Sequence, residues 1–246
     1  MIDVAQTPLH DDFTFQSCPG GPRNVIIQTR GILPPLAPDA PPGYFSDGRT
    51  YPMTTDPNDP ALGLGARDGL PDALRVLLDD YPRAGWQADP NFDGLVRFWL
   101  SKHLSFREML AILTRETQAA ADGADPARFA AALSRIGGRL VGELHGHHGI
   151  EDAHYFPRLS AMEPRLEAGF ALLDGDHHAL DAHLADFVEA ANALIGVADA
   201  PAEMRGEAAR FAARLEGLER FLDRHLVDEE ELVVPVLLHH GTGALG

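Results

Sequence analysis

The residues with the clearest chemical potential lie between Leu144 and Leu159, a stretch that holds four histidines and two acidic residues. In a helix, residues four apart lie nearly above one another, so His147 and Glu151 point the same way and His154 follows one turn later. Leu140 shares that stripe, which places an imidazole and a carboxylate on a face that should be buried. Because an uncompensated buried carboxylate is costly, a bound metal cation is its expected partner.

Three further segments also place histidine on an apolar helical stripe. His103 and His177 each share a face with large apolar residues, and His225 is followed four residues later by Glu229. The inward-facing set therefore comprises four histidines and two glutamates: His103, His147, Glu151, His177, His225 and Glu229. Two carboxylates among nitrogen ligands can bridge a pair of cations, which suits a dinuclear site of iron, manganese or zinc.

Composition narrows the functional classes. The net charge of -17 would repel phosphate backbones and anionic lipid surfaces, so we expect no binding to nucleic acid or membrane. Cys18 is the sole cysteine, which excludes an internal disulfide framework and a thiolate zinc cluster. The chain starts without a basic, apolar leader, and no stretch approaches the roughly 20 apolar residues of a membrane span. We therefore expect a cytoplasmic protein.

The elements that must position these ligands are helices. After Asn91 the sequence consists of long amphipathic segments that have helix-start and helix-stop residues at their ends. Four helices are predicted: 92–121, 126 to an end or kink near Pro157, a helix after Pro164 that closes near Gly196, and one from Pro201 until Pro235 disturbs it. Short connections favour antiparallel neighbours, so we predict an all-α, up-down-up-down four-helix bundle over residues 91–240.

The first 90 residues differ from the rest of the chain. They contain 14 of the 19 prolines, which forbids long helices there. We predict an irregular, Pro-rich extension over residues 1–90 that packs on the bundle. Between Leu70 and Tyr81, apolar residues recur at helical spacing, and Pro71 is tolerated in a first turn. A short accessory helix is therefore predicted over residues 70–81.

The order of ligands along the chain resembles that of the hemerythrin-like family, also called the HHE cation-binding domain. One histidine, a His-x-x-x-Glu pair, one histidine and a second His-x-x-x-Glu pair occur on successive helices. The phrases His147–Asp152 and His225–Glu230 are similar to the signatures of that family. The resemblance implies a four-helix bundle around an oxo- or hydroxo-bridged pair of iron ions that binds dioxygen or a related small ligand. It also implies the six residues above as ligands, with Glu151 and Glu229 as bridges.

Two departures from the oxygen-carrying hemerythrins bear on function. Those proteins place a second histidine four residues after the third-helix ligand, where this chain has Asp181. Their last carboxylate is an aspartate five residues after its histidine, whereas here Glu229 comes at four and Glu230 at five. Fewer nitrogen ligands favour an open position on one iron, and hence reactivity or sensing over reversible carriage.

The remaining histidines are divided by their positions. His148, His154 and His178 are kept as candidate additional ligands or second-layer donors, and Tyr155 as a residue that could hydrogen-bond near the site. Five others are expected to face solvent or to cap chain ends: His10, His145, His183, His239 and His240.

We interpret the chain as a non-haem di-iron protein that binds dioxygen, nitric oxide or iron for sensing, storage or stress defence. A di-iron oxidase or peroxidase is the first alternative, and a metal-free helical interaction protein is the second. A ferritin-like oxidase would need two Glu-x-x-His pairs, whereas only Glu151 and His154 form one. A zinc hydrolase is disfavoured because His-Glu-x-x-His is absent. The oligomeric state stays open.

Overall fold

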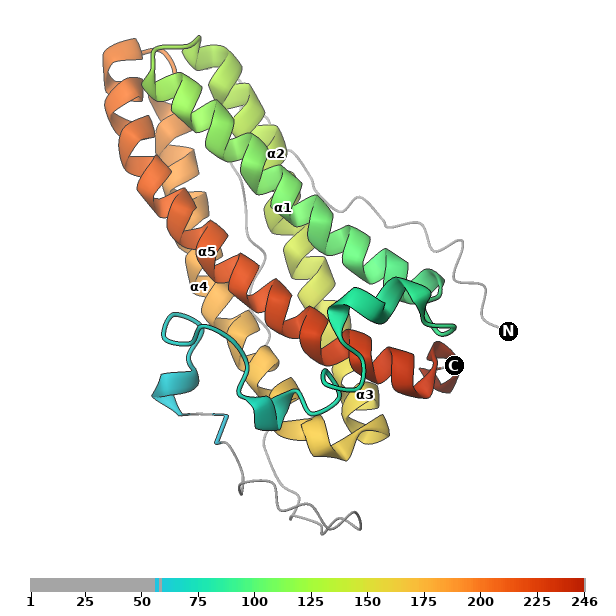
Figure 1. Cartoon of the computed structure of the whole chain (residues 1–246). Helices are drawn as coiled ribbons and strands as arrows, with labels where there is room; N and C mark the ends of the chain where they lie inside the picture. The colour runs from blue at the N-terminus through green and yellow to red at the C-terminus, as the bar shows by residue number, and fades with distance from the viewer. Residues whose placement is uncertain (1–55, 58, 246) are drawn as a thin grey trace.

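The computed structural model describes residues 56–57 and 59–245, and every regular element within them is helical. The α-helices are α1 (Gly94–Ala121), α2 (Pro126–Ile150), α3 (Phe156–Met162), α4 (Glu167–Gly196) and α5 (Pro201–His240) (Figure 1). Shorter turns are the 3-10 elements η1 (Pro60–Leu62), η2 (Asp72–Leu74), η3 (Arg83–Ala88), η5 (Pro164–Leu166) and η6 (Thr242–Leu245), and the π-helical turn η4 (Glu151–Tyr155). The all-α prediction is confirmed for these residues. None of their helices has the length and apolar character needed to cross a membrane.

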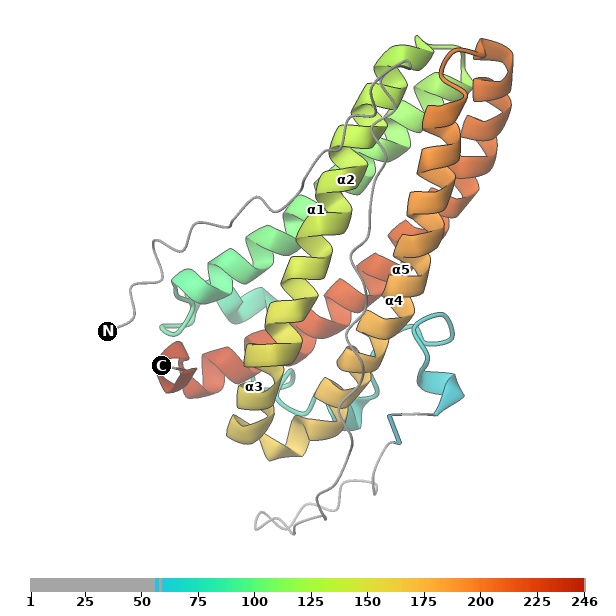
Figure 2. The same cartoon turned by 180° about the vertical axis from the view of Figure 1, so that it is seen from behind.

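The four long helices lie side by side, and consecutive ones run in opposite directions (Figures 1 and 2). Helix α1 packs against α2 and α5, and α4 packs against the same two helices. The short helix α3 lies at the end of the molecule where α2 passes into α4 (Figure 1). Residues 59–90 cross α5 at this same end before the chain enters α1 (Figure 1).

Local sequence explains where the first two helices begin and end. Asp93 caps α1 by accepting from the backbone N–H of Leu95 at 2.9 Å. Gly123, at φ 95°, follows its end, in a left-handed conformation that glycine adopts without strain. Asp125 caps α2 through the N–H of Ala127, with Pro126 in the first turn. These boundaries agree with the prediction from the sequence.

Two helix ends differ from the prediction. Where the sequence predicts an end or a kink near Pro157, α2 ends at Ile150 and continues through one π-helical turn into α3, and Phe156 donates its N–H to the carbonyl of Glu151, five residues back. Helix α5 runs through Pro235 to His240, although a proline costs an interior helix about 3 kcal/mol. Pro235 is buried within an apolar stretch from Leu232 to Leu238, and this burial offsets the lost hydrogen bond.

The predicted accessory helix over residues 70–81 is wrong in its regular structure. The segment forms one 3-10 turn at Asp72–Leu74 and then irregular turns. Its apolar residues Leu70, Leu74 and Leu77 are nevertheless buried in the core beside α4 and α5. A helix this short gains little from its own hydrogen bonds, so packing decides its conformation. Residues 1–55, with His10 and Cys18, lie outside the described residues.

The apolar interior consists of two separate cores. One fills the end near the α1–α2 connection, and the other fills the end that holds α3 and residues 59–90. Along each long helix, the predicted ligands fall between a residue of one core and a residue of the other: Trp99 and Phe106 on α1, Leu144 on α2 and Phe156 on α3, Leu173 and Leu180 on α4, and Leu222 and Leu232 on α5. The predicted ligands therefore form a buried polar layer across the middle of the apolar interior.

Candidate metal centre

The buried polar layer contains two adjoining groups of potential metal ligands. The first group, cluster A, comprises His103, His147, Glu151 and Glu229. The second, cluster B, comprises His148, His177 and His225. Within each group, one ligand atom from every residue lies within 4.8 Å of the others. The structure thus brings together all six residues that the sequence singled out, and adds His148.

The spacing within cluster A is that of ligands to one ion. The Nε2 atoms of His103 and His147 are 3.0 Å apart. Glu151 Oε1 lies 2.9 Å from His147 Nε2, and Glu229 Oε1 lies 3.4 Å from His103 Nε2. Two nitrogens about 2.1 Å from one metal ion would be separated by about 3.0 Å at the right angles of an octahedral site and by about 3.4 Å in a tetrahedral one, so the two imidazoles are placed as neighbouring ligands.

Cluster B is built from three imidazoles on three helices. The rings of His148 and His177 stack with centroids 4.0 Å apart, and the ring of His177 meets that of His225 edge-on at 4.8 Å. All three residues are buried, His225 completely. This places three buried nitrogen donors around a common point.

The two glutamates connect the clusters. Glu151 directs Oε1 at His147 of cluster A and Oε2 at His177 of cluster B, the latter at 3.7 Å from Nε2. Glu229 likewise lies 3.4 Å from His103 through Oε1 and 3.4 Å from His225 through Oε2. A carboxylate that presents one oxygen to each of two adjoining ligand groups has the arrangement of a bridge between two metal ions.

Seven buried side-chain atoms of the two clusters have no hydrogen-bond partner within the described chain. Buried atoms without a partner include both nitrogens of His148, both oxygens of Glu151, Nε2 of His177, Nε2 of His225 and Oε2 of Glu229. Each unsatisfied buried polar atom costs about 1 to 3 kcal/mol. Six of these seven atoms can present a lone pair, because a neutral His148 keeps one N–H, and a pair of cations would satisfy lone pairs that no donor in the described chain reaches.

A carboxylate fixes the outer nitrogen of three histidines. Asp152 Oδ1 lies 2.7 Å from His177 Nδ1, and Glu230 Oε1 lies 3.1 Å from His103 Nδ1. Asp176 Oδ2 lies 3.4 Å from His225 Nδ1. Each contact favours the tautomer whose Nε2 lone pair points into the layer, as is common for metal-binding histidines.

Sequence reasoning did not assign these outer carboxylates. Asp152 and Glu230 each follow a predicted ligand, and Asp176 precedes one. On a helix, such a neighbour points about 100° away and is indistinguishable from a solvent-facing charge. The one usable signal is the recurrence of an acid directly beside three of the six predicted ligands.

Burial controls protonation in the layer. It lowers the pKa of His147 to about 3, and burial with the charge of His177 lowers the pKa of His148 well below its ordinary value. Burial and the charge of Glu229 raise the pKa of Glu151 well above its ordinary value. Two imidazoles are therefore neutral and ready to donate, whereas full ionisation of both glutamates requires additional positive charge.

Of the candidate extra ligands, only His148 joins the layer. His154 and His178 are exposed. His154 does not lie on the same helix face as His147. The π-helical turn contains more residues than an α-helical turn, so each residue rotates by a smaller angle about the helix axis. Tyr155 packs edge-on against Trp99, with ring centroids 5.0 Å apart.

The histidines expected outside the layer are indeed elsewhere within the described chain. His145 faces Asp181 at 3.3 Å, and His183 stacks on Phe221. His239 and His240 are exposed near the end of α5.

A third group of metal-binding residue types, Glu163 with His239 and His240, differs from the layer. Arg165 donates to both oxygens of Glu163, at 2.7 and 2.8 Å. The hydroxyl of Tyr81 lies 3.0 Å from His239 Nδ1. These groups already have partners, so nothing here calls for a cation.

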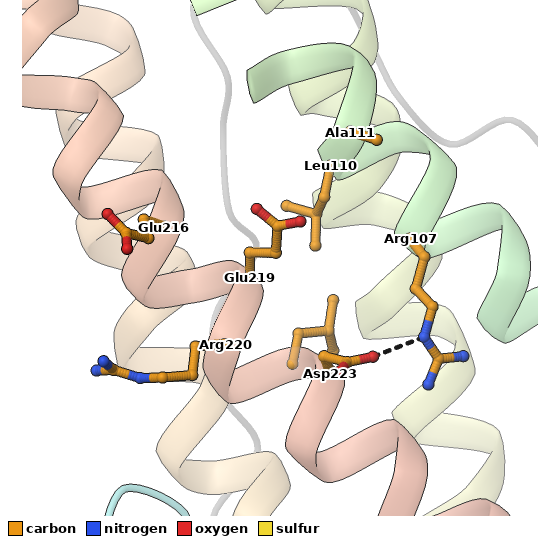
Figure 3. A pocket seen from close by; sticks show the side chains of 8 residues that line it. Arg107, Leu110, Ala111, Glu216, Glu219, Arg220 and Asp223 are labelled. Carbon is orange, nitrogen blue, oxygen red and sulfur yellow. Dashed lines mark hydrogen bonds and ion pairs between the residues drawn. The ribbon is translucent and has the colours of Figure 1, made fainter. Parts of the chain in front are cut away.

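A surface pocket of about 500 Å³ lies between α1 and α5, outside the layer (Figure 3). Arg107 reaches across it to Asp223, with Nε 2.7 Å from Oδ1 (Figure 3). The same side chain donates to Glu230 at 2.8 Å. The pocket is thus linked to His103 through Arg107 and Glu230 but does not contain either cluster.

Comparison with known proteins agrees with this geometry. The model of the hemerythrin HHE cation binding domain matches residues 94–237, more than half of the chain and a range that includes both clusters. No curated protein and no solved structure matches the chain. With this match the resemblance seen in the sequence is confirmed, and the chain belongs to the hemerythrin HHE cation-binding family.

Proposed function

We propose that the chain is a hemerythrin-type four-helix bundle that holds two metal ions, normally iron, one in each cluster. The observation that carries this proposal is the pair of bridging glutamates, each of which faces a histidine of both clusters. The proposed ligands are His103 and His147 in cluster A, His148, His177 and His225 in cluster B, and Glu151 and Glu229 between them. His148 would be the fifth histidine ligand, in place of the histidine that oxygen-carrying hemerythrins have at the position of Asp181.

The donor set supports iron. Imidazole and carboxylate together suit iron, manganese and zinc, whereas the described residues of the layer include no thiolate that would select a softer metal. The two ionised glutamates bring negative charge into the buried layer, and a pair of divalent or trivalent cations would offset it. Manganese and zinc remain competitors for the same ligands.

The unequal numbers of histidines in the two clusters support a binding position for a small ligand in cluster A. Cluster A offers two imidazoles and cluster B three, so a further coordination position is expected on the cluster A side. A pair of iron ions, when bound, would supply binding of dioxygen or nitric oxide at such a position. Phe106 and Trp99 contact the ring of His147, with centroids 5.2 and 6.0 Å away, and these apolar rings exclude water from that side.

This arrangement supports a role in sensing, storage or stress defence through binding of dioxygen, nitric oxide or iron. An oxidase or peroxidase that uses the same centre is the alternative, and turnover assays separate the two. A metal-free interaction protein is disfavoured by the seven buried atoms without partners.

The test is metal analysis and absorption spectroscopy on the full chain produced in iron-supplemented medium. We expect close to two metals per chain, mostly iron, and absorption in the near ultraviolet from a bridged iron pair. One tightly bound zinc per chain, or no metal after iron loading, would overturn the proposal.

A further inference from the structure

A buried arginine connects residues 59–90 to the metal centre. Arg67 is 7% exposed and inserts between α4 and α5. Its Nη1 donates to Asp176 Oδ1 at 2.9 Å, and its Nη2 donates to the other oxygen of the same carboxylate. Its Nε donates to Asp228 Oδ2 at 2.8 Å. Arg67 thus holds one carboxylate on each of two helices.

Asp176 passes this contact on to a proposed ligand. Its Oδ2 atom lies 3.4 Å from His225 Nδ1, and His225 Nε2 points into cluster B. The guanidinium of Arg67 therefore contacts the carboxylate of Asp176, and that carboxylate contacts the imidazole of His225, whose other nitrogen belongs to cluster B. Among the described residues, Arg67 is the only arginine or lysine in contact with Asp176.

A second arginine of the same segment repeats this arrangement at the other cluster. Arg83 Nη1 donates to Glu230 Oε2 at 2.6 Å, and Glu230 Oε1 lies 3.1 Å from His103 Nδ1. Here Arg107 of α1 also donates to Glu230, at 2.8 Å. Within the described part of the chain the two clusters therefore differ, because the carboxylate beside His103 accepts from two arginines and the carboxylate beside His225 accepts from one.

Close packing shows that the loop around Arg67 is built against α5. A Cβ added at Gly65 would lie 2.9 Å from Phe221 Cε1, so the loop approaches the helix more closely than a side chain allows. Arg67 also donates to the carbonyl of Leu62 at 2.6 Å, and Asp228 accepts from the N–H of Leu70. One bond holds the guanidinium to a carbonyl that precedes Arg67 in the sequence, and the other holds Asp228, its partner, to an N–H that follows Arg67.

The energetics favour a positioning role over simple stabilisation. Burying an ion pair removes both charges from water, a cost that their attraction roughly offsets, so a buried pair adds little net stability. The guanidinium is planar and holds both oxygens of Asp176 in one orientation, which fixes the oxygen that faces His225.

We infer that residues 59–90 form a clamp on the metal centre, in which Arg67 positions His225 through Asp176 and Arg83 positions His103 through Glu230. This inference rests on the proposed function. It assigns residues 59–90 a part in holding the metals, with Arg67 as the more critical residue because no second arginine among the described residues contacts Asp176.

The test uses the full chain loaded with iron and follows metal release to a chelator in Arg67→Met. Removing a residue behind a metal-binding histidine typically weakens metal binding about 10- to 100-fold. We expect one of the two metals to leave about tenfold faster or more, with a change in near-ultraviolet absorption. Arg83→Met should have a smaller effect alone and a larger one when combined with Arg107→Met.

Arg75→Met is the matched control, because Arg75 lies in the same segment and pairs with Asp72 and Glu231, neither of which contacts a proposed ligand. It should release metal at the wild-type rate. Asp176→Asn tests the middle contact, should also speed release, and should add little to Arg67→Met. If Arg67→Met does not fold, Asp176→Asn and Arg67→Lys decide the question by the same measurement.

Several outcomes would overturn the clamp: wild-type release from Arg67→Met or Asp176→Asn, equal loosening by Arg75→Met, or full additivity of the first two changes. Failure of the proposed function is distinguishable, because the wild-type chain itself would then lack a pair of metals. A wild-type chain with two metals and an unchanged Arg67→Met variant rejects the clamp alone.

Discussion

Trp99 donates its indole N–H to Oε1 of Glu229, the carboxylate that lies between the two clusters. Trp99 belongs to α1 and Glu229 to α5, so the hydrogen bond joins two helices across the layer. Glu229 Oε1 also lies 3.4 Å from His103 Nε2. The indole therefore helps to set which way a proposed bridging oxygen points.

Trp99→Phe tests this hydrogen bond while retaining most of the apolar ring. A hydrogen bond to a charged group contributes about 1.5 to 3 kcal/mol, so the free energy of unfolding should fall by about that amount. Metal release to a chelator should also be faster, because Glu229 loses a fixed donor. Denaturant unfolding and chelator kinetics measure the two effects.

The matched control is Trp86→Phe, since the indole of Trp86 is buried and donates to the carbonyl of Tyr81 at 2.8 Å, away from both clusters. It should lower stability but alter metal release much less than Trp99→Phe does, because the phenyl ring still packs against Arg83. Identical release kinetics in the two variants would contradict the role given to Trp99.

A core substitution should separate folding from metal binding. Leu133 is fully buried in the core near the α1–α2 connection and lies fourteen residues before His147 along α2, about 21 Å at 1.5 Å per residue. Leu133→Ala should lower the free energy of unfolding by about 2 to 5 kcal/mol through the cavity it leaves. Two metals per folded chain should remain by elemental analysis. Loss of metal from folded protein would show that the two cores are coupled to the layer.

Helical periodicity was sufficient to identify six residues of the layer, because each lies on the apolar stripe of its own helix. It could not identify His148, which points about 100° away from His147 on the same helix. Both enter the layer because they serve different clusters, one on each side of α2's inward face. A single helical stripe carries the residues of one ligand group, whereas two adjoining groups require a wider face of the helix.

Two other features lie beyond sequence periodicity. The π-helical turn at Glu151–Tyr155 precedes Pro157, but proline is also compatible with an end or a kink, and tertiary packing decides among them. Arg67 lies in a Gly-rich, aperiodic loop, so its partners on α4 and α5 depend on long-range packing that no local pattern encodes.

The stability gained from metal should increase with pH. Burial and Glu229 raise the pKa of Glu151; for His225, although burial opposes it, Asp176 and Glu229 raise the pKa to about 9. A group with a raised pKa in the folded state stabilises the metal-free fold while protonated, and this contribution is lost as pH rises through that pKa. Metal binding requires both groups without their protons, so acid favours metal release.

The difference in Tm between iron-loaded and chelator-treated protein should therefore widen between about pH 5 and about pH 8, a range in which the pKa of His225 still keeps it protonated without metal. Thermal melts at several pH values measure it. In Glu151→Gln the side chain cannot ionise, so the Tm difference between the iron-loaded and chelator-treated protein should be smaller at every pH. A Tm difference that is constant or narrows with pH contradicts this prediction.

The last prediction concerns two pairs of adjacent histidines, His147–His148 on α2 and His177–His178 on α4. In the first pair both side chains enter the layer, one in each cluster. In the second pair His177 is buried in cluster B, whereas His178 is exposed and contacts the carbonyl of Asp174 through Nδ1 at 2.9 Å. Alanine at three of the four positions should therefore disturb the metals, and alanine at His178 should not.

His148→Ala and His177→Ala each remove one of the three imidazoles of cluster B, so each should lose at least one metal and weaken near-ultraviolet absorption. His147→Ala should instead disturb the metal in cluster A. X-ray absorption and Mössbauer spectra can distinguish this from loss of the metal in cluster B. His178→Ala removes an imidazole of the same chemistry one residue away and serves as the internal control. If His178→Ala strips metal, the placement of α4 against the centre is wrong; if His148→Ala keeps two metals and the wild-type spectrum, cluster B has only two histidine ligands and the fifth histidine lies elsewhere.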